Sequence, residues 1–172
     1  LRSLDSGIST KNYADANQLL ESIKGYQIKY ASDIIPSDEK IHAEIMYNKY
    51  DIFRNLFMYY FLAGLLFFIF IILNIFSENK SIHNFMKYIF IIFRSSIVLL
   101  FIAHTLGLIA RWYISGHAPW GDAYESMIYV AWATMGIGLL FIKKSDLTLA
   151  STSFVTSMIL MIAHWNWMDP SI

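Results

Sequence analysis

Cysteine is absent from this chain of 172 residues, and charged residues make up only 15% of it. Without cysteine the chain itself holds no disulfide, no thiolate metal site and no cysteine nucleophile. The formal net charge is zero, so no basic surface favours nucleic acid as a partner. A glycine-rich phosphate loop is also missing. Since a soluble domain carries about 25% charged residues, the composition disfavours a single water-soluble globule.

The chain contains long stretches without any charged residue. Residues 55–77 and 148–168 contain no Asp, Glu, Lys or Arg, whereas 15 of the 26 charged residues lie in residues 1–54. A helix needs roughly 20 apolar residues to cross a bilayer. The pattern therefore predicts four membrane-spanning helices, at about 55–76, 88–110, 123–142 and 147–164.

The predicted fold class is all-α: a fragment of an integral membrane helical bundle with a polar, helical N-terminal extramembrane segment. We expect residues 1–54 to be extracytoplasmic and residues 55–172 to form the membrane domain. The polar start of the chain has no apolar core of the kind a signal peptide needs. Because the first residue is Leu1 rather than methionine, we expect a piece of a longer polypeptide.

The N-terminal segment has a weaker pattern. Residues 1–12 show no periodicity and indicate a loop, whereas residues 13–30 have the apolar spacing of an amphipathic helix. Pro36 is expected to interrupt this helix, and Ser37 is a good N-cap for the next one. From there the pattern predicts one unbroken helix over residues 38–76 that enters the membrane.

The distribution of lysine predicts the orientation of the spans. The connections at 77–87 and 143–146 contain Lys80, Lys87, Lys143 and Lys144, whereas the connection at 111–122 has only Arg111. The positive-inside rule places the first two connections in the cytoplasm and the third outside. An aromatic belt is expected at the outer interface, formed by Trp112, Tyr113, Trp120, Tyr124, Trp165 and Trp167.

The outer connection and the start of the following helix are the most informative segment. Asp122 can cap a helix, and Glu125 stands three residues later, where a capping-box acid belongs. On a helix, Glu125, Tyr129 and Trp132 share one face. Two interpretations stay open: a helix start with ordinary packing, or a polar and aromatic surface that meets a flat ligand.

Polar side chains inside predicted spans are the other candidates, because burying them in lipid is costly. His104 and His164 could ligate a heme iron between helices, or each could be hydrogen-bonded to a neighbouring helix. Arg111 could pair with an anionic group such as a heme propionate, or anchor the helix at the interface. Arg94 is expected to extend toward the lipid headgroups. His117 lies in the outer connection.

The outer connection resembles the first outer loop of the CcsA/ResC type of cytochrome c biogenesis protein. The resemblance is carried by the core Gly116-His117-Ala118-Pro119-Trp120 and by Tyr124-Glu125-Ser126-Met127. Residues 163–172 look like the stretch before that family's outer histidine helix. Residues 34–54 resemble the junction of fused CcsBA (ResB–ResC) synthases, which suggests a fragment of such a protein.

The resemblance implies a membrane protein that exports heme b to the periplasmic face of the bacterial inner membrane and attaches it to Cys-x-x-Cys-His motifs of apocytochrome c. Its partners would be heme, apocytochrome c, the remaining part of the same synthase and the lipid bilayer. The family's tryptophan-rich WGxxWxWD segment is absent here, so no axial ligand or catalytic residue is assigned to this segment. Supporting roles at the heme site are expected for Arg111, His117, Trp120, Tyr124, Glu125 and Trp132.

Two other functions remain open on the residues alone. A membrane b-type cytochrome subunit would hold a heme for electron transfer between His104 and His164. A scaffold or transporter half would need only packed helices and no cofactor. A heme absorption spectrum that disappears on substitution of either histidine would favour the first of these.

Overall fold

The computed structural model describes residues 13–30, 37–118 and 120–165, and all regular elements in these ranges are helices. The loop expected at 1–12, the break expected at Pro36 and the belt residue Trp167 lie outside the described residues. Contacts divide the chain into two units, Leu1–Ile41 and His42–Ile172. The helices are α2 (Ala14–Tyr30), α3 (Asp38–Tyr50), α4 (Ile52–Phe76), α5 (Lys80–Ser115), α6 (Ala123–Leu140) and α7 (Asp146–His164).

The helix expected over residues 38–76 is interrupted at Asp51, which separates α3 from α4. Asp51 has φ 41° and ψ 58°, in the left-handed region. Aspartate tolerates this region better than most side chains because its short polar group can bond locally. The Asn55 side chain donates a hydrogen bond of 2.8 Å to the Tyr50 carbonyl oxygen. This bond satisfies a carbonyl at the end of α3, so the break is a capped helix end.

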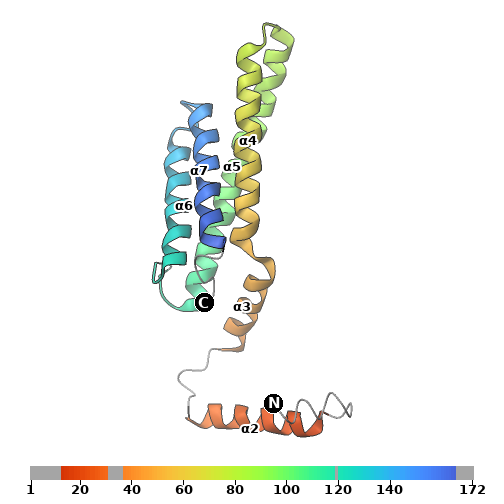
Figure 1. Cartoon of the computed structure of the whole chain (residues 1–172), viewed down its shortest axis with the longest axis vertical. Helices are drawn as coiled ribbons and strands as arrows, with labels where there is room; N and C mark the ends of the chain where they lie inside the picture. Colours follow the sequence, from red (N-terminus) through yellow and green to blue (C-terminus); the bar gives the residue numbers. More distant parts are fainter. Residues whose placement is uncertain (1–12, 31–36, 119, 166–172) are drawn as a thin grey trace. The chain divides into compact units, whose positions relative to one another are not determined.

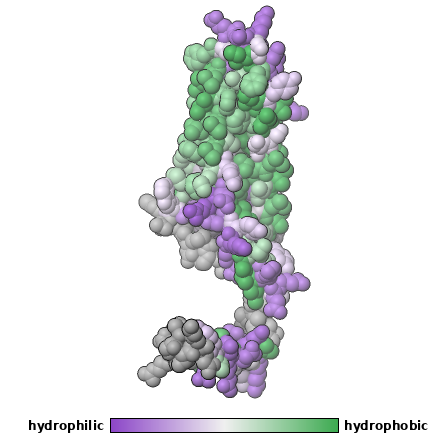
Figure 2. Space-filling view, turned by 90° about the vertical axis from the view of Figure 1, so that its right-hand side faces the viewer, coloured by the Kyte–Doolittle hydropathy of each residue, from purple (hydrophilic) through white to green (hydrophobic). Residues whose placement is uncertain are grey.

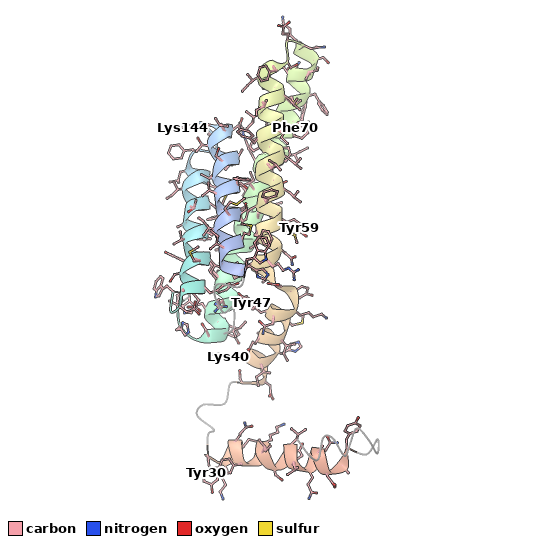
Figure 3. The ribbon with its side chains drawn as sticks, viewed as in Figure 1. Tyr30, Lys40, Tyr47, Tyr59, Phe70 and Lys144 are labelled. Carbon is pink, nitrogen blue, oxygen red and sulfur yellow. The ribbon has the colours of Figure 1, made fainter. Side chains whose placement is uncertain are left out.

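Helices α4 to α7 pack side by side as two hairpins (Figure 1), with α7 making extensive contact with both α4 and α6. Phe70 on α4 and Lys144 in the α6–α7 turn lie at about the same level in Figure 3. Beyond that level the α4–α5 hairpin continues alone. Its apolar side chains there are exposed, among them Phe76, Phe85 and Tyr88.

Local sequence explains where these helices begin and end. Asn79, Asp122 and Ser145 are the N-caps of α5, α6 and α7, and each side chain accepts a bond from a backbone amide of the first turn. The capping role predicted for Asp122 is therefore confirmed, with a bond of 2.6 Å from the Glu125 amide. Gly116 ends α5 with φ 75°, a conformation that costs glycine nothing.

Small side chains let α7 approach its neighbours closely. A Cβ atom placed on Gly64 of α4 would lie 2.8 Å from the Phe154 backbone nitrogen of α7. The Ser153 hydroxyl donates a bond of 3.0 Å to the Tyr60 carbonyl oxygen across the same interface. Gly138 of α6 has Thr152 directly against it. Close contacts between small and hydroxyl residues are typical of helices packed in lipid.

Three helical stretches are long and apolar enough to cross a membrane: Asp38–Phe76, Lys80–Ser115 and Asp146–His164. The face drawn in Figure 2 shows a broad hydrophobic band along the α4–α5 side of the bundle, ending in hydrophilic residues at the tip of the α4–α5 hairpin. These helices indicate a multi-pass membrane protein. α6 does not meet the same criterion; its 18 residues include Glu125 and several Tyr and Trp side chains, which lower its hydropathy. A fourth span is thus not established by length and composition.

Arg94 is paired in the bundle rather than extended toward lipid headgroups. Its Nε and Nη2 atoms donate bonds of 2.7 and 2.9 Å to the two carboxylate oxygens of Asp146, at the start of α7. A two-pronged guanidinium–carboxylate contact is among the strongest polar contacts in proteins. The contact neutralises the one charged side chain in the middle of α5 and ties α5 to α7. An unpaired charge within a lipid bilayer would be costly, so a partner for Arg94 is expected there.

Replacing Arg94 with glutamine is expected to destabilise the bundle by about 1–2 kcal/mol, because both bonds to Asp146 are lost while the pair is partly screened by solvent. Lys87→Gln is the matched control on the same helix. Lys87 is exposed, and its Nζ atom donates only a long bond of 3.4 Å to the Asn84 Oδ1 atom. Thermal unfolding in detergent measures both variants. Equal melting temperatures for the two would contradict the assigned role of the Arg94–Asp146 pair.

Candidate functional site

The connection between α5 and α6 is built around a buried ion pair. The Arg111 Nε atom donates a bond of 2.9 Å to the Glu125 Oε1 atom. The two side chains are only 1% and 2% exposed. Arg111 belongs to the last turns of α5 and Glu125 to the first turn of α6. The pair therefore clamps the two helices together at the base of the loop.

Glu125 also holds the loop itself. Its second oxygen, Oε2, accepts a bond of 2.7 Å from the Gly121 backbone amide, just before the N-cap. Its own amide donates to the Asp122 side chain. This arrangement is close to a capping box, in which the third helical residue reaches back to a free amide. Glu125 thus serves both as a helix-start residue and as the partner of a buried charge.

Aromatic side chains surround the Arg111 guanidinium. It lies 5.1 Å from the centre of the Tyr124 ring, in a cation–π contact. The Tyr47 hydroxyl of α3 lies close enough to interact with it electrostatically, and Figure 3 shows where Tyr47 leaves α3. The Asp122 carboxylate is 3.7 Å from the Arg111 Nη2 atom. The fixed charge is therefore compensated on several sides.

His117 stands apart from this buried pair. Its side chain is 60% exposed, and its Nδ1 atom lies 3.9 Å from the Glu125 Oε2 atom, beyond hydrogen-bond distance. The same nitrogen is 3.1 Å from the Ala118 carbonyl oxygen, to which it can donate. The imidazole is thus accessible from outside the loop.

An open apolar groove lies beside the loop, on the surface of α5 and α6; we call it the aromatic groove. It has a volume of about 170 Å³ and is lined by Thr105, Leu108, Ile109, Trp112, Ala118, Trp120, Tyr129 and Trp132. The Tyr129 ring stacks on Trp132 at 5.6 Å and meets the edge of Trp120 at 5.7 Å. The Trp132 indole nitrogen donates a bond of 2.9 Å to the Thr105 hydroxyl, which fixes the ring.

His104 is fully buried among α4, α5 and α6. Its Nε2 atom lies 3.1 Å from the Ile128 carbonyl oxygen of α6, so the proton is assigned to this nitrogen. The Phe53 and Tyr60 rings pack around it at 5.5 and 6.0 Å. This is the arrangement expected of a histidine hydrogen-bonded to a neighbouring helix.

His164 has different neighbours at the end of α7. Its ring stacks on Phe57 of α4 at 6.4 Å, and it lines a second pocket with Arg54. None of the contacts described for His104 includes His164. Within the described ranges, no group of three or more His, Asp or Glu residues is placed to hold a metal ion.

The structure therefore divides the predicted site residues into two sets. Arg111, Tyr124 and Glu125 are buried together under the loop, whereas Trp120 and Trp132 line the aromatic groove. Sequence analysis missed Thr105 and Tyr47. Thr105 shares a helical face with Leu108 and Trp112, a signal that was available. Tyr47 comes from a distant helix, and no local pattern predicts its contact with Arg111.

Comparison with known proteins gives the chain its family. No family model matches it. It is 34% identical over 169 residues to protein NrfI of Wolinella succinogenes, covering 98% of this chain and 18% of NrfI. It is 35% identical over 81 residues to cytochrome c biogenesis protein CcsA of Prochlorococcus marinus, covering 47% of this chain and 25% of the relative. CcsA of Lotus japonicus is 30% identical over 84 residues, covering 41% of the chain and 25% of the relative.

The chain spans a quarter or less of the length of these relatives. Its apolar helices and its loop motif agree with the similarity. These findings place the chain among the CcsA-type cytochrome c biogenesis proteins.

Proposed function

We propose that this chain is part of a membrane cytochrome c synthase, which carries heme to the periplasmic face of the bacterial inner membrane and attaches it to Cys-x-x-Cys-His motifs of apocytochrome c. One observation carries the proposal: the buried Arg111–Glu125 pair holds the family's loop rigidly beside an open aromatic groove. The similarity to cytochrome c biogenesis protein CcsA supplies the pathway.

The proposal includes a fourth span and an orientation. α6 packs along α7, and its 18 residues extend about 27 Å, close to the roughly 30 Å of a bilayer core. A helix that runs beside a spanning neighbour crosses the same layer. With Lys80, Lys87, Lys143 and Lys144 in the cytoplasm, the loop at 111–122 and the N-terminal segment 1–54 face the periplasm.

Within the whole synthase, the aromatic groove would receive one edge of the heme substrate. Its volume of about 170 Å³ is below the 300–1,000 Å³ of pockets that enclose a complete small molecule. Trp120 and Trp132 offer flat apolar contacts, and His117 an accessible imidazole. Attachment adds each cysteine S–H bond across a vinyl C=C bond of the heme, which forms a thioether without net oxidation.

The buried residues would contribute by holding the loop in place, without touching the heme. Arg111 and Glu125 set the loop against the bundle, and Tyr124 covers the guanidinium. The remaining part of the same synthase would supply the axial histidines and the other walls of the site. The alternative function as a b-type cytochrome would need His104 and His164 to face one iron, and none of the contacts described for His104 includes His164, so we do not carry it further.

Trp120→Ala in the full-length synthase is expected to lower the yield of covalent cytochrome c about fivefold, because a stacking contact worth about 1 kcal/mol is lost at the groove. The yield is measured by heme staining of the denatured cytochrome and normalised to the amount of synthase. Tyr59→Ala is the control, since Tyr59 is an exposed aromatic residue of α4 outside the groove. A wild-type yield from Trp120→Ala would remove the loop from the heme site.

A further inference from the structure

A second pocket lies between the first turn of α4 and the last turn of α7, apart from the aromatic groove. Five residues line it: Arg54, Phe57, Met161, His164 and Trp165. We call it the Arg54–His164 pocket. Its volume is about 400 Å³, within the range of pockets that bind small molecules. The start of α4, the end of α5 and the end of α7 belong to one end of the bundle (Figure 1), so this pocket lies at the same end as the loop at 111–122.

His164 lines this pocket, and one of its ring nitrogens, Nδ1, is buried in the protein. Its ring stacks on Phe57 at an interplanar angle of 28°. The Nδ1 atom is buried and has no hydrogen-bond partner. Because a buried N–H without a partner is rarer and costlier than a bare acceptor, the proton belongs on Nε2. The accessible nitrogen of the ring is therefore a donor.

Arg54 contributes a guanidinium that the described residues leave weakly paired. Its one described ion pair is with Asp51, at 3.9 Å between Nη1 and Oδ2. That separation exceeds the 2.7–3.2 Å of a good N–H···O bond. The Arg54 and Asp51 side chains are 58% and 42% exposed, so the pair has little hold on the guanidinium. Its donors remain available to a ligand.

The rest of the pocket is apolar. Phe57 and Trp165 present aromatic surfaces, and Met161 presents a thioether one helical turn from His164. Thioethers and aromatic rings adapt well to flat apolar ligands. Two donors and three apolar side chains in one pocket match a molecule that has an anionic group on an apolar body. With one fixed positive charge and Asp51 nearby, a singly charged carboxylate fits better than a doubly charged phosphate.

We propose that the Arg54–His164 pocket binds the carboxylate of an apolar ligand, with Arg54 and the Nε2 atom of His164 as donors and Phe57, Met161 and Trp165 around the apolar body. A porphyrin propionate and a fatty acid share this chemistry. The porphyrin source rests on the proposed function, in which heme is the cargo. The carboxylate site itself does not depend on that function.

The test uses the full-length protein in lipid nanodiscs with three probes: metal-free protoporphyrin IX, its dimethyl ester and oleate. Binding of each porphyrin is followed by its fluorescence anisotropy, with empty nanodiscs as the background. Oleate is tested as a competitor of the acid. Protoporphyrin IX is expected to bind at least tenfold more tightly than its ester, because the ester has no carboxylate for Arg54. Whichever of protoporphyrin IX and oleate binds more tightly shows whether the pocket prefers a porphyrin propionate or a fatty acid.

Three variants assign the binding to these side chains. Arg54→Gln is expected to weaken binding of the acid about tenfold and to leave the ester unchanged. His164→Phe keeps a ring against Phe57 but removes the donor, and should weaken the acid severalfold. Lys49→Gln, which removes an exposed cation of α3 outside the pocket, should have no effect. Equal binding of acid and ester, or equal effects of Arg54→Gln and Lys49→Gln, would overturn the proposal.

This readout is separate from cytochrome c formation. Failure of the Trp120 variant to lower the cytochrome yield would count against the proposed function and leave the pocket untouched. Failure of the Arg54 variant to lower porphyrin binding would count against the pocket and leave the proposed function untouched.

Discussion

Glu125→Gln in the full-length protein is expected to lower the free energy of unfolding by about 3–5 kcal/mol and the yield of covalent cytochrome c at least tenfold. The glutamine side chain still has an oxygen to accept the Gly121 amide, so the loop contact can persist. What is lost is the negative charge beside a guanidinium that is 1% exposed. Removing the closest counter-ion of a buried charge is among the largest penalties that a single substitution can cause.

Asp122→Asn is the matched control for this prediction. Asparagine caps a helix as well as aspartate does, and Asp122 is 48% exposed and 3.7 Å from Arg111. Removing the Asp122 charge should therefore change the free energy of unfolding by less than about 1 kcal/mol. Thermal unfolding in detergent and heme staining of the cytochrome measure both variants. Similar losses in the two would show that charge near the loop matters in general and that the Arg111–Glu125 contact has no special role.

The double variant Arg111→Met with Glu125→Gln sharpens the test. Removing both charges takes away the guanidinium whose closest counter-ion is lost in Glu125→Gln, so part of the lost stability should return. A double variant that is less stable than Glu125→Gln alone would contradict the assignment of the penalty to the loss of the Glu125 counter-ion of Arg111. Recovery of stability without recovery of cytochrome yield would indicate that the guanidinium also contributes to function.

Gly64→Val is expected to have the second large effect, because it separates α4 from α7. An added Cβ would lie 2.8 Å from the Phe154 nitrogen and 2.9 Å from the Ala150 oxygen, and both are backbone atoms that cannot rotate away. Overpacking of this kind costs about 1–3 kcal/mol for a single methyl group and more for a branched side chain. Gly64→Ala should therefore lower the melting temperature, and Gly64→Val should lower it further.

Gly25→Ala in α2 is the control for this series. A Cβ at Gly25 meets nothing within 4 Å, and alanine favours a helix over glycine by about 1 kcal/mol. The substitution should be neutral or slightly stabilising. Protease resistance of the membrane domain reports the same ranking without heating. A Gly64→Ala protein as stable as the Gly25→Ala protein would show that α4 and α7 can shift apart freely.

The helical architecture was predictable because lipid leaves the backbone few choices. Stretches such as residues 55–77 have no charge to stop a helix, and helix starts such as Asp122 follow from local capping chemistry. The break at Asp51 was not predictable, since a left-handed aspartate inside an apolar and helical pattern leaves no periodic signal. The extension of Arg94 toward the lipid headgroups was predicted from its place near the end of a span; its partner, Asp146, lies 52 residues away and leaves no local signal.

In the candidate site, too, local features were predictable from the sequence and contacts between helices were not. The loop was recognised from its motif, and the face shared by Glu125, Tyr129 and Trp132 from helical spacing. The pairing of Arg111 with Glu125 depends on how the chain turns between two helices, which no spacing specifies. For His104, the interpretation as a hydrogen-bonded histidine agrees with its Ile128 contact. Arg54 had no local signal, because its pocket is completed by α7 more than 100 residues later.

The Arg111–Glu125 pair also constrains how the protein is synthesised. Glu125 leaves the ribosome 14 residues after Arg111, so the closest counter-ion of the guanidinium arrives only with the first turn of α6. If α6 crosses the bilayer as proposed, a lone α5 released sideways into lipid would expose that charge near its C-terminal end, and a lone α6 would expose the carboxylate. Partitioning becomes favourable only when both segments leave the translocon as a neutralised hairpin. The two helices should therefore be inserted in one step during translation.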